Sequence, residues 1–156
     1  AKLSAGLCKN GCNLGESSMS RLGNYFTIML MVEHEGDKSS LQGITSSVCD
    51  PLNLDSHIVE LEDGSQQNFE PDVRISLFAE DRMGVVEDAT GPLANAGLNI
   101  LHLESNLGED GEAGTYYIHI EGTLAESIGP IKKVLEKLEE EKGIKSHLIP
   151  INTRIS

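Results

Sequence analysis

The sequence contains one internal repeat, and this repeat restricts the folds that the chain can adopt. Residues 7–14, LCKNGCNL, read like residues 93–100, LANAGLNI, at an offset of 86 residues. Residues 56–59, SHIV, read like residues 146–149, SHLI, at an offset of 90 residues, and both segments are predicted to form the last strand of a domain. We expect the additional residues of the second copy in the glycine-rich stretch 108–114. A repeat of this length predicts two copies of one small domain.

The repeat divides the chain into a first domain at residues 1–61, a linker at 62–70 and a second domain at 71–156. The first domain begins late, because Ala1 aligns with Glu87 and nothing matches the first strand of the second domain. We expect this domain to be N-terminally incomplete, since helices packed on a sheet without that strand would leave backbone groups unpaired. A degenerate first domain is the alternative.

Hydrophobic periodicity in the second domain predicts the order β-α-β-β-α-β. Apolar residues alternate from Val73 to Ala79, as in a strand with one buried face. They follow helical spacing from Val85 to Ala96, and Gly97 predicts the end of that helix. The remaining predicted elements are strands at 98–107, 115–122 and 144–151 and a helix at 128–140. The fold class is therefore α+β, with two ferredoxin-like domains that place two helices on one face of an antiparallel sheet.

Charge and composition disfavour several classes of partner. Asp and Glu number 25 against 12 Lys and Arg, so the net charge of −13 disfavours direct binding to nucleic acid or to an anionic membrane. No apolar run reaches the roughly 18 residues of a membrane span. Three cysteines without a secretory signal indicate a reducing compartment, and we expect the cytoplasm. The chain starts with Ala1 and not with Met, so organellar targeting stays open.

Side chains of the catalytic and metal-ligating types form no recognisable pattern. Cys8, Cys12, Cys49 and His57 are metal-ligand types, but their spacing favours free buried cysteines over a metal site. The sequence contains neither a nucleophile elbow nor a phosphate-binding P-loop. We therefore predict no catalytic residues, no metal and no cofactor. An enzyme on a ferredoxin-like scaffold remains the alternative, because the fold permits one.

The turn between the first strand and the first helix of the second domain, Asp81–Gly84, is a candidate ligand site. A glycine there allows close backbone approach to a ligand, and the free N–H groups of the helix attract a carboxylate. Two alternatives stay open, since the segment could be an ordinary turn and Asp81 could cap the helix. Asn99 and its counterpart Asn13 could read an amino acid through their amides, or they could bond to the backbone of a turn.

These residues resemble those of the ACT domain family, small ligand-binding regulatory modules of amino-acid metabolism. The resemblance rests on Asp81-x-x-Gly84-Val85-Val86, on the segment 93–100, on Glu104-Ser105 and on the segment 116–120. In the first copy, Gly11-Cys-Asn13-Leu14 with residues 26–30 is similar to the glycine-cleavage-system transcriptional repressor type. Family members generally carry a proline in the loop where this chain has Met83.

The resemblance implies domains that pair through their sheets and hold an amino acid between the loop of one domain and the second strand of a neighbour. Carried over by position, the loop contributes Asp81, Arg82, Met83, Gly84 and Val85. The facing strand contributes Asn99 and Ile100, with Asn13 and Leu14 as their first-copy equivalents.

We thus expect a non-catalytic module that binds an amino acid or related effector and signals through a protein partner, forming a homodimer. A regulator protein of glycine-cleavage-type transcription is one such partner. Two alternatives remain. One is a ligand-free structural or docking pair of ACT domains, and the other is a regulatory part related to prephenate dehydratase, which segment 98–105 also resembles.

Overall fold

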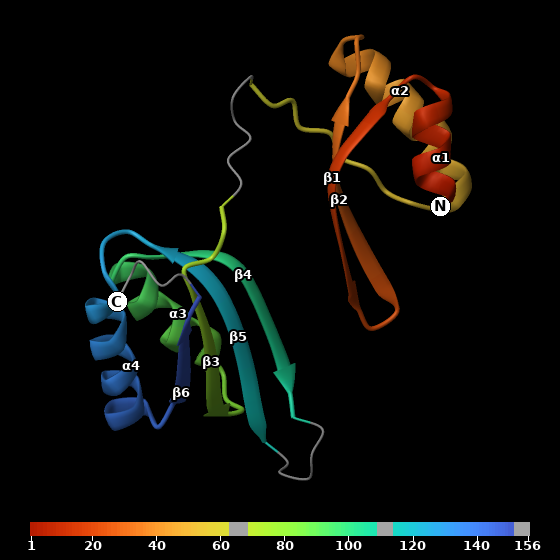
Figure 1. Ribbon diagram of the computed structural model, residues 1–156. Helices are drawn as coiled ribbons and strands as arrows, with labels where there is room; N and C mark the ends of the chain where they lie inside the picture. Colours follow the sequence, from red (N-terminus) through yellow and green to blue (C-terminus); the bar gives the residue numbers. More distant parts are fainter. Residues whose placement is uncertain (63–68, 109–113, 152–156) are drawn as a thin grey trace. The chain divides into compact units, whose positions relative to one another are not determined.

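The computed structural model describes residues 1–62, 69–108 and 114–151. The chain forms two compact units, residues 1–66 and 67–156 (Figure 1). Across the described residues, no helix combines the length and the apolar character that crossing a bilayer requires.

The second unit has the predicted order of elements. It consists of β3 (Val73–Glu80), α3 (Val85–Asn95), β4 (Leu98–Leu107), β5 (Thr115–Leu124), α4 (Ile128–Lys142) and β6 (Lys145–Pro150). The four strands pair antiparallel in the order β4-β5-β3-β6. This arrangement confirms the split βαββαβ motif and its strand and helix positions.

The core of the second unit lies between its sheet and its two helices. Alternate residues of β3, among them Val73, Ile75 and Leu77, are fully buried, whereas the intervening ones face away from the core. Leu93 of α3 and Ile131 of α4 pack in the same cluster, so both helices cover one face of the sheet (Figure 1). Burial of each such side chain stabilises the fold by roughly 1.5–3 kcal/mol.

The first unit repeats part of this arrangement. It contains α1 (Lys2–Lys9), β1 (Asn13–Leu22), β2 (Tyr25–Glu33), α2 (Lys38–Cys49) and the short 3-10 helix η1 (Asp50–Leu52). β1 and β2 form an antiparallel hairpin. The irregularity between Leu14 and Ser17 of β1 corresponds to the one between Ile100 and His102 of β4, so the strand register follows the sequence repeat.

Backbone conformations repeat at the same two offsets. Gly11 and Gly97 follow α1 and α3 with φ angles of +79° and +95°. Asn53 follows η1 and Gly143 follows α4, with φ angles of +56° and +65°. A left-handed residue at these positions ends each helix and redirects the chain. The first pair is 86 residues apart and the second pair 90, as in the sequence alignment.

The additional residues of the second copy fall between β4 and β5. In the first unit, β1 ends at Leu22 and β2 begins at Tyr25, whereas β4 ends at Leu107 and β5 begins at Thr115. Residues 109–113, which carry most of the predicted insertion, lie outside the described residues.

The prediction of a strand at residues 56–59 is wrong. Residues 54–62 are described and contain no strand. The reason lies in the pairing of the equivalent strand, because within the described part of the second unit β6 pairs with β3 alone. Residues 1–62 include no counterpart of β3, so residues 56–59 have no neighbouring strand to complete a ladder.

Candidate functional site

The Asp81–Gly84 turn is held by a backbone hydrogen bond where it leaves β3, and its tip is exposed to solvent. Asp81 N donates to the carbonyl oxygen of Gly114 at 2.6 Å. Met83 is 99% exposed. Gly84 has a φ of +82°, and a Cβ atom placed there would meet no atom within 4 Å. The glycine is therefore required by the backbone conformation and not by crowding.

Asp81 does not cap the helix that follows the turn. Gly84 occupies the N-cap position of α3, and no side chain accepts a hydrogen bond there. In α2, by contrast, Asp37 Oδ1 accepts from Ser40 N at 2.8 Å. The capping alternative for Asp81 is thus wrong, and the first N–H groups of α3 have no side-chain acceptor from the cap residue.

Two cations converge on Asp88 beside this turn. Arg82 Nη2 lies 2.6 Å from Asp88 Oδ2, and Lys142 Nζ lies 2.7 Å from Asp88 Oδ1. Hydrogen bonds from Lys142 first, and then from Arg82, hold the pKa of Asp88 below its usual value. The sequence analysis missed Asp88 and Lys142, because only the packing of α4 beside α3 brings them together.

Asn99 and Asn13 have equivalent bonds in the two units. Asn99 Nδ2 donates to Thr123 Oγ1 at 3.3 Å, and Asn13 Nδ2 donates to Glu33 Oε2 at 3.0 Å. Each bond crosses from the start of one strand to the facing residue of the next. Each of these bonds crosses between strands and is not the bond to the backbone of a turn that the sequence left open as an alternative, and both side chains are exposed.

The predicted site residues divide into separate groups. The loop residues Asp81 to Val85 follow the last residue of β3. Asn99 pairs with Thr123, and the residue before Thr123 pairs with Val73, the first residue of β3. The loop and Asn99 therefore lie at opposite ends of β3. Eight strand residues at about 3.3 Å each separate the two ends. Ile100 packs against the core, and Asn13 and Leu14 belong to the first unit. One domain alone therefore does not bring the loop and Asn99 together.

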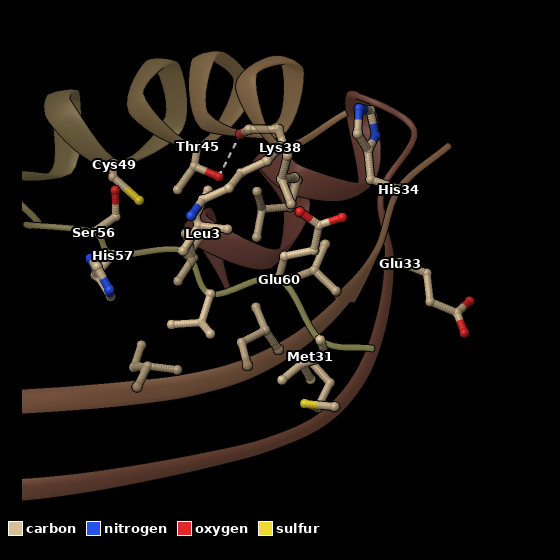
Figure 2. Close-up of a pocket in the computed structure, with 18 of the residues that line it drawn as sticks. Leu3, Met31, Glu33, His34, Lys38, Thr45, Cys49, Ser56, His57 and Glu60 are labelled. Carbon is tan, nitrogen blue, oxygen red and sulfur yellow. Dashed lines mark hydrogen bonds between the residues drawn. The ribbon is translucent and has the colours of Figure 1, made fainter. Parts of the chain in front are cut away.

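The first unit contains a groove of about 890 Å³ that the sequence analysis did not predict. Figure 2 shows side chains from the helices and from residues 54–62 around this space. Lys38 and Thr45 come from α2, and Ser56 and Glu60 come from the segment 54–62 after η1. Its volume lies within the range of about 300–1,000 Å³ that is typical of small-molecule pockets.

All three cysteines are free thiols. Cys8 is exposed, whereas Cys12 and Cys49 are buried. Burial raises the pKa of both buried thiols, and Cys12 Sγ lies 4.0 Å from His34 Nδ1. Within residues 1–62, 69–108 and 114–151, no three His, Cys, Asp or Glu side chains gather as a metal site would require.

Comparison with known proteins finds a family model that matches part of the chain. Residues 73–140 match the model of the ACT domain. A curated relative, an uncharacterized protein of Methanocaldococcus jannaschii, is 32% identical over 76 residues. This match covers 49% of the chain and 34% of the relative, so the chain spans about a third of that protein's length.

Two solved structures are similar over nearly the whole chain. A protein of unknown function from Galdieria sulphuraria superposes with a TM-score of 0.71 and 21% identity, covering 97% of this chain and 89% of the other. A candidate glycine cleavage system transcriptional repressor superposes with a TM-score of 0.73 and 13% identity, covering 97% and 88%. At these identities the similarity shows the fold alone, which both structures share with this chain over nearly its whole length.

Proposed function

Starting from the ACT domain at residues 73–140, we propose that this chain is a non-catalytic regulatory protein that binds an amino acid or a related small effector. The repeated backbone geometry of the two units supports reading the chain as a tandem of ACT domains, with residues 62–70 as the linker. The effector changes the pairing of these domains, and a partner protein reads that change.

The observation that carries this proposal is the separation of the two halves of the predicted site. The loop Asp81–Val85 and the residues Asn99 and Ile100 lie at opposite ends of one sheet. A ligand that contacts both must sit between two domains, as the family resemblance implies. A ligand that binds the paired state more tightly than the separate one shifts the equilibrium toward pairing.

The chemistry of each half suits an amino acid. The first amides of α3, with Gly84 left without a side chain, suit a carboxylate. Asn99 uses one of its two amide N–H donors on Thr123, which leaves the second donor for a ligand's carboxylate and the carbonyl oxygen for its ammonium. Asn13 and Leu14 serve as the same half-site in the first unit.

The net charge favours a protein over DNA as the partner of this chain. At −13, the chain disfavours direct contact with DNA, so a role in transcription acts through a regulator protein. Control of glycine-cleavage-type transcription is the instance that the second structural neighbour suggests. A homodimer is the expected assembly.

Calorimetric titration with glycine, serine and phenylalanine tests effector binding, and sedimentation velocity tests whether the effector changes association. Asn99→Ala should abolish binding. Thr123→Ala is the matched control, because it removes the same cross-strand bond and keeps the Asn99 amide. Equal loss of binding in both variants would assign Asn99 a structural role only.

A second candidate function is a ligand-free docking pair of ACT domains. The observation in its favour is that Asn13 and Asn99 both bond across neighbouring strands, which gives the repeated asparagine a structural use. If none of the common amino acids binds and the melting temperature stays unchanged in their presence, this second function is the correct one.

A further inference from the structure

The groove of the first unit lies where the second unit has a strand. In the second unit, β3 lies between β5 and β6 and fills the centre of the sheet. By the repeat, the counterpart of β5 is β2, and the counterpart of β6 lies in the segment 54–62. β2 pairs with β1 along one edge, and among the described residues no strand pairs with its other edge.

The register of the second unit identifies the walls of this space. Leu77 of β3 faces Ile118 of β5 and Ser146 of β6. At the offset of 90 residues, the corresponding positions are Ile28 and Ser56. Ile75 likewise faces Ile120 and Leu148, which correspond to Leu30 and Ile58. The groove is lined by these four counterparts: Ile28, Leu30, Ser56 and Ile58.

Exposure of the lining differs from that of the equivalent residues in the second unit. Ile118 is 1% exposed, whereas its counterpart Ile28 is 37% exposed. Among the residues that line the groove, Leu3 and Leu7 come from α1 and Leu41 comes from α2. Their counterparts Ala89, Leu93 and Ile131 are core residues of the second unit, in contact with a cluster that includes β3.

We infer that this groove is a docking slot for one β-strand: an extended polypeptide segment of about eight residues, apolar at alternate positions, that runs antiparallel to β2. Main-chain hydrogen bonds to the open edge of β2 provide affinity, and pockets for alternate side chains provide specificity. Both strands of residues 1–62 are already paired with each other, so the docked strand comes from outside these residues.

The charges around the groove define the ends of the docked segment. Glu33, Asp37, Asp55 and Glu60 are acidic, against Lys38 as a basic lining residue. Basic residues at the ends of the segment therefore complement the rim. A strand fits this groove better than a small molecule does. Its backbone can hydrogen-bond to the open edge of β2 while its alternate side chains occupy the apolar pockets.

Binding of a synthetic peptide to the unmodified chain tests this inference. The probe is a fluorescently labelled peptide with the sequence of residues 73–79, VRISLFA, and a lysine at each end, since β3 fills the equivalent position in the second unit. The control peptide carries Ile75→Ser and Leu77→Ser at an unchanged charge. Fluorescence polarisation should show saturable binding of the probe and at least about tenfold weaker binding of the control peptide.

Neighbouring residues of β2 offer matched protein variants. Ile28 lines the groove, whereas Met29 alternates to the other face of the strand and is 73% exposed. Ile28→Asp should weaken probe binding by about tenfold or more, and Met29→Asp should leave it within about twofold. Hydrogen exchange at the amides of β2 should slow when the probe binds, which reports strand pairing directly.

Three results would overturn the inference. The first is equal binding of the probe and its serine control, and the second is equal weakening by Ile28→Asp and Met29→Asp. The third is a dimer of the chain that Ile28→Asp dissociates and Met29→Asp does not, which would make a second copy the occupant. Because the probe does not involve the Asp81–Val85 loop, these outcomes are independent of amino-acid binding at that loop.

Discussion

Lys142 Nζ lies 2.7 Å from Asp88 Oδ1, so the last turn of α4 is joined to the first turn of α3 across 54 residues of sequence. Both charges also complement the helix dipoles, because the carboxylate lies near the N-terminus of α3 and the ammonium near the C-terminus of α4. Arg82 from the candidate ligand loop joins the same carboxylate. The loop is thereby coupled to the packing of the two helices.

This ion-pair cluster predicts an acid-dependent loss of stability. The pKa of Asp88 is lowered in the folded state, so its contribution is present above the unfolded value of about 3.9 and is lost as pH falls through the lower folded pKa. Melting temperatures between pH 2.5 and pH 7 should fall more steeply for the native chain than for Asp88→Asn. Glu87→Gln, a change at the exposed neighbouring position, is the control and should follow the native curve. Parallel curves for the native chain and Asp88→Asn would contradict the expectation.

Truncation to alanine of two equivalent isoleucines, one in each unit, should lower the free energy of unfolding by different amounts. Ile118→Ala removes a side chain that is closed in by β3, and it should destabilise the second unit by about 2–5 kcal/mol. Ile28→Ala removes the counterpart that borders the open groove, and it should cost at most about 1 kcal/mol. Native-state hydrogen exchange at β5 and at β2 measures the two effects separately. A similar cost at both positions would show that the first unit buries Ile28 in solution.

Substitution by alanine of two glycines in the first unit should change the stability of that unit in opposite directions. A Cβ atom at Gly43 or at Gly11 would meet no atom within 4 Å, so crowding plays no part at either position. Gly43 lies inside α2, and Gly43→Ala should stabilise the unit by about 0.5–1 kcal/mol. Gly11 has a φ of +79°, and Gly11→Ala should destabilise it by about 1–2 kcal/mol. Urea unfolding measures both, and stabilisation by Gly11→Ala would show that the turn after α1 is not left-handed.

The three thiols should react in one fast and two slow phases. Cys8 is exposed, whereas burial both covers Cys12 and Cys49 and raises their pKa, which lowers the reactive thiolate fraction. A colorimetric thiol reagent at pH 8 measures the rates. Cys8→Ser should remove the fast phase and leave the two slow ones. Three equal rates would show that the helices of the first unit open faster than the reagent reacts.

The sequence predicted elements best where one periodicity covered a whole strand or helix. The alternation from Val73 to Ala79 predicted β3 and its buried face, and the helical spacing after Val85 predicted α3. The same reasoning failed at residues 56–59, whose apolar pattern resembles that of β6 but whose partner strand is absent from the first unit. A pattern records that a segment suits a strand, but pairing requires a neighbour that the pattern does not contain.

The candidate site could be predicted only in part, for a similar reason. The loop Asp81–Val85 is continuous in sequence, and its residues indicated the turn between a strand and a helix that the chain makes there. The contacts of Asp88 with Lys142 and of Asn99 with Thr123 join residues that are 54 and 24 positions apart. No local pattern specifies such pairs, because they depend on helix packing and strand register.

The sequence by itself determined the repeat, the α+β class and the segments of the second unit, because hydrophobic periodicity and glycine conformation are local properties of the chain. The tertiary structure alone decided which end of the sheet each half of the candidate site occupies. It also decided that the first unit has an open groove where the second has a closed core. Burial depends on what lies across from a side chain, and residues with the same pattern, such as Ile28 and Ile118, therefore have different surroundings.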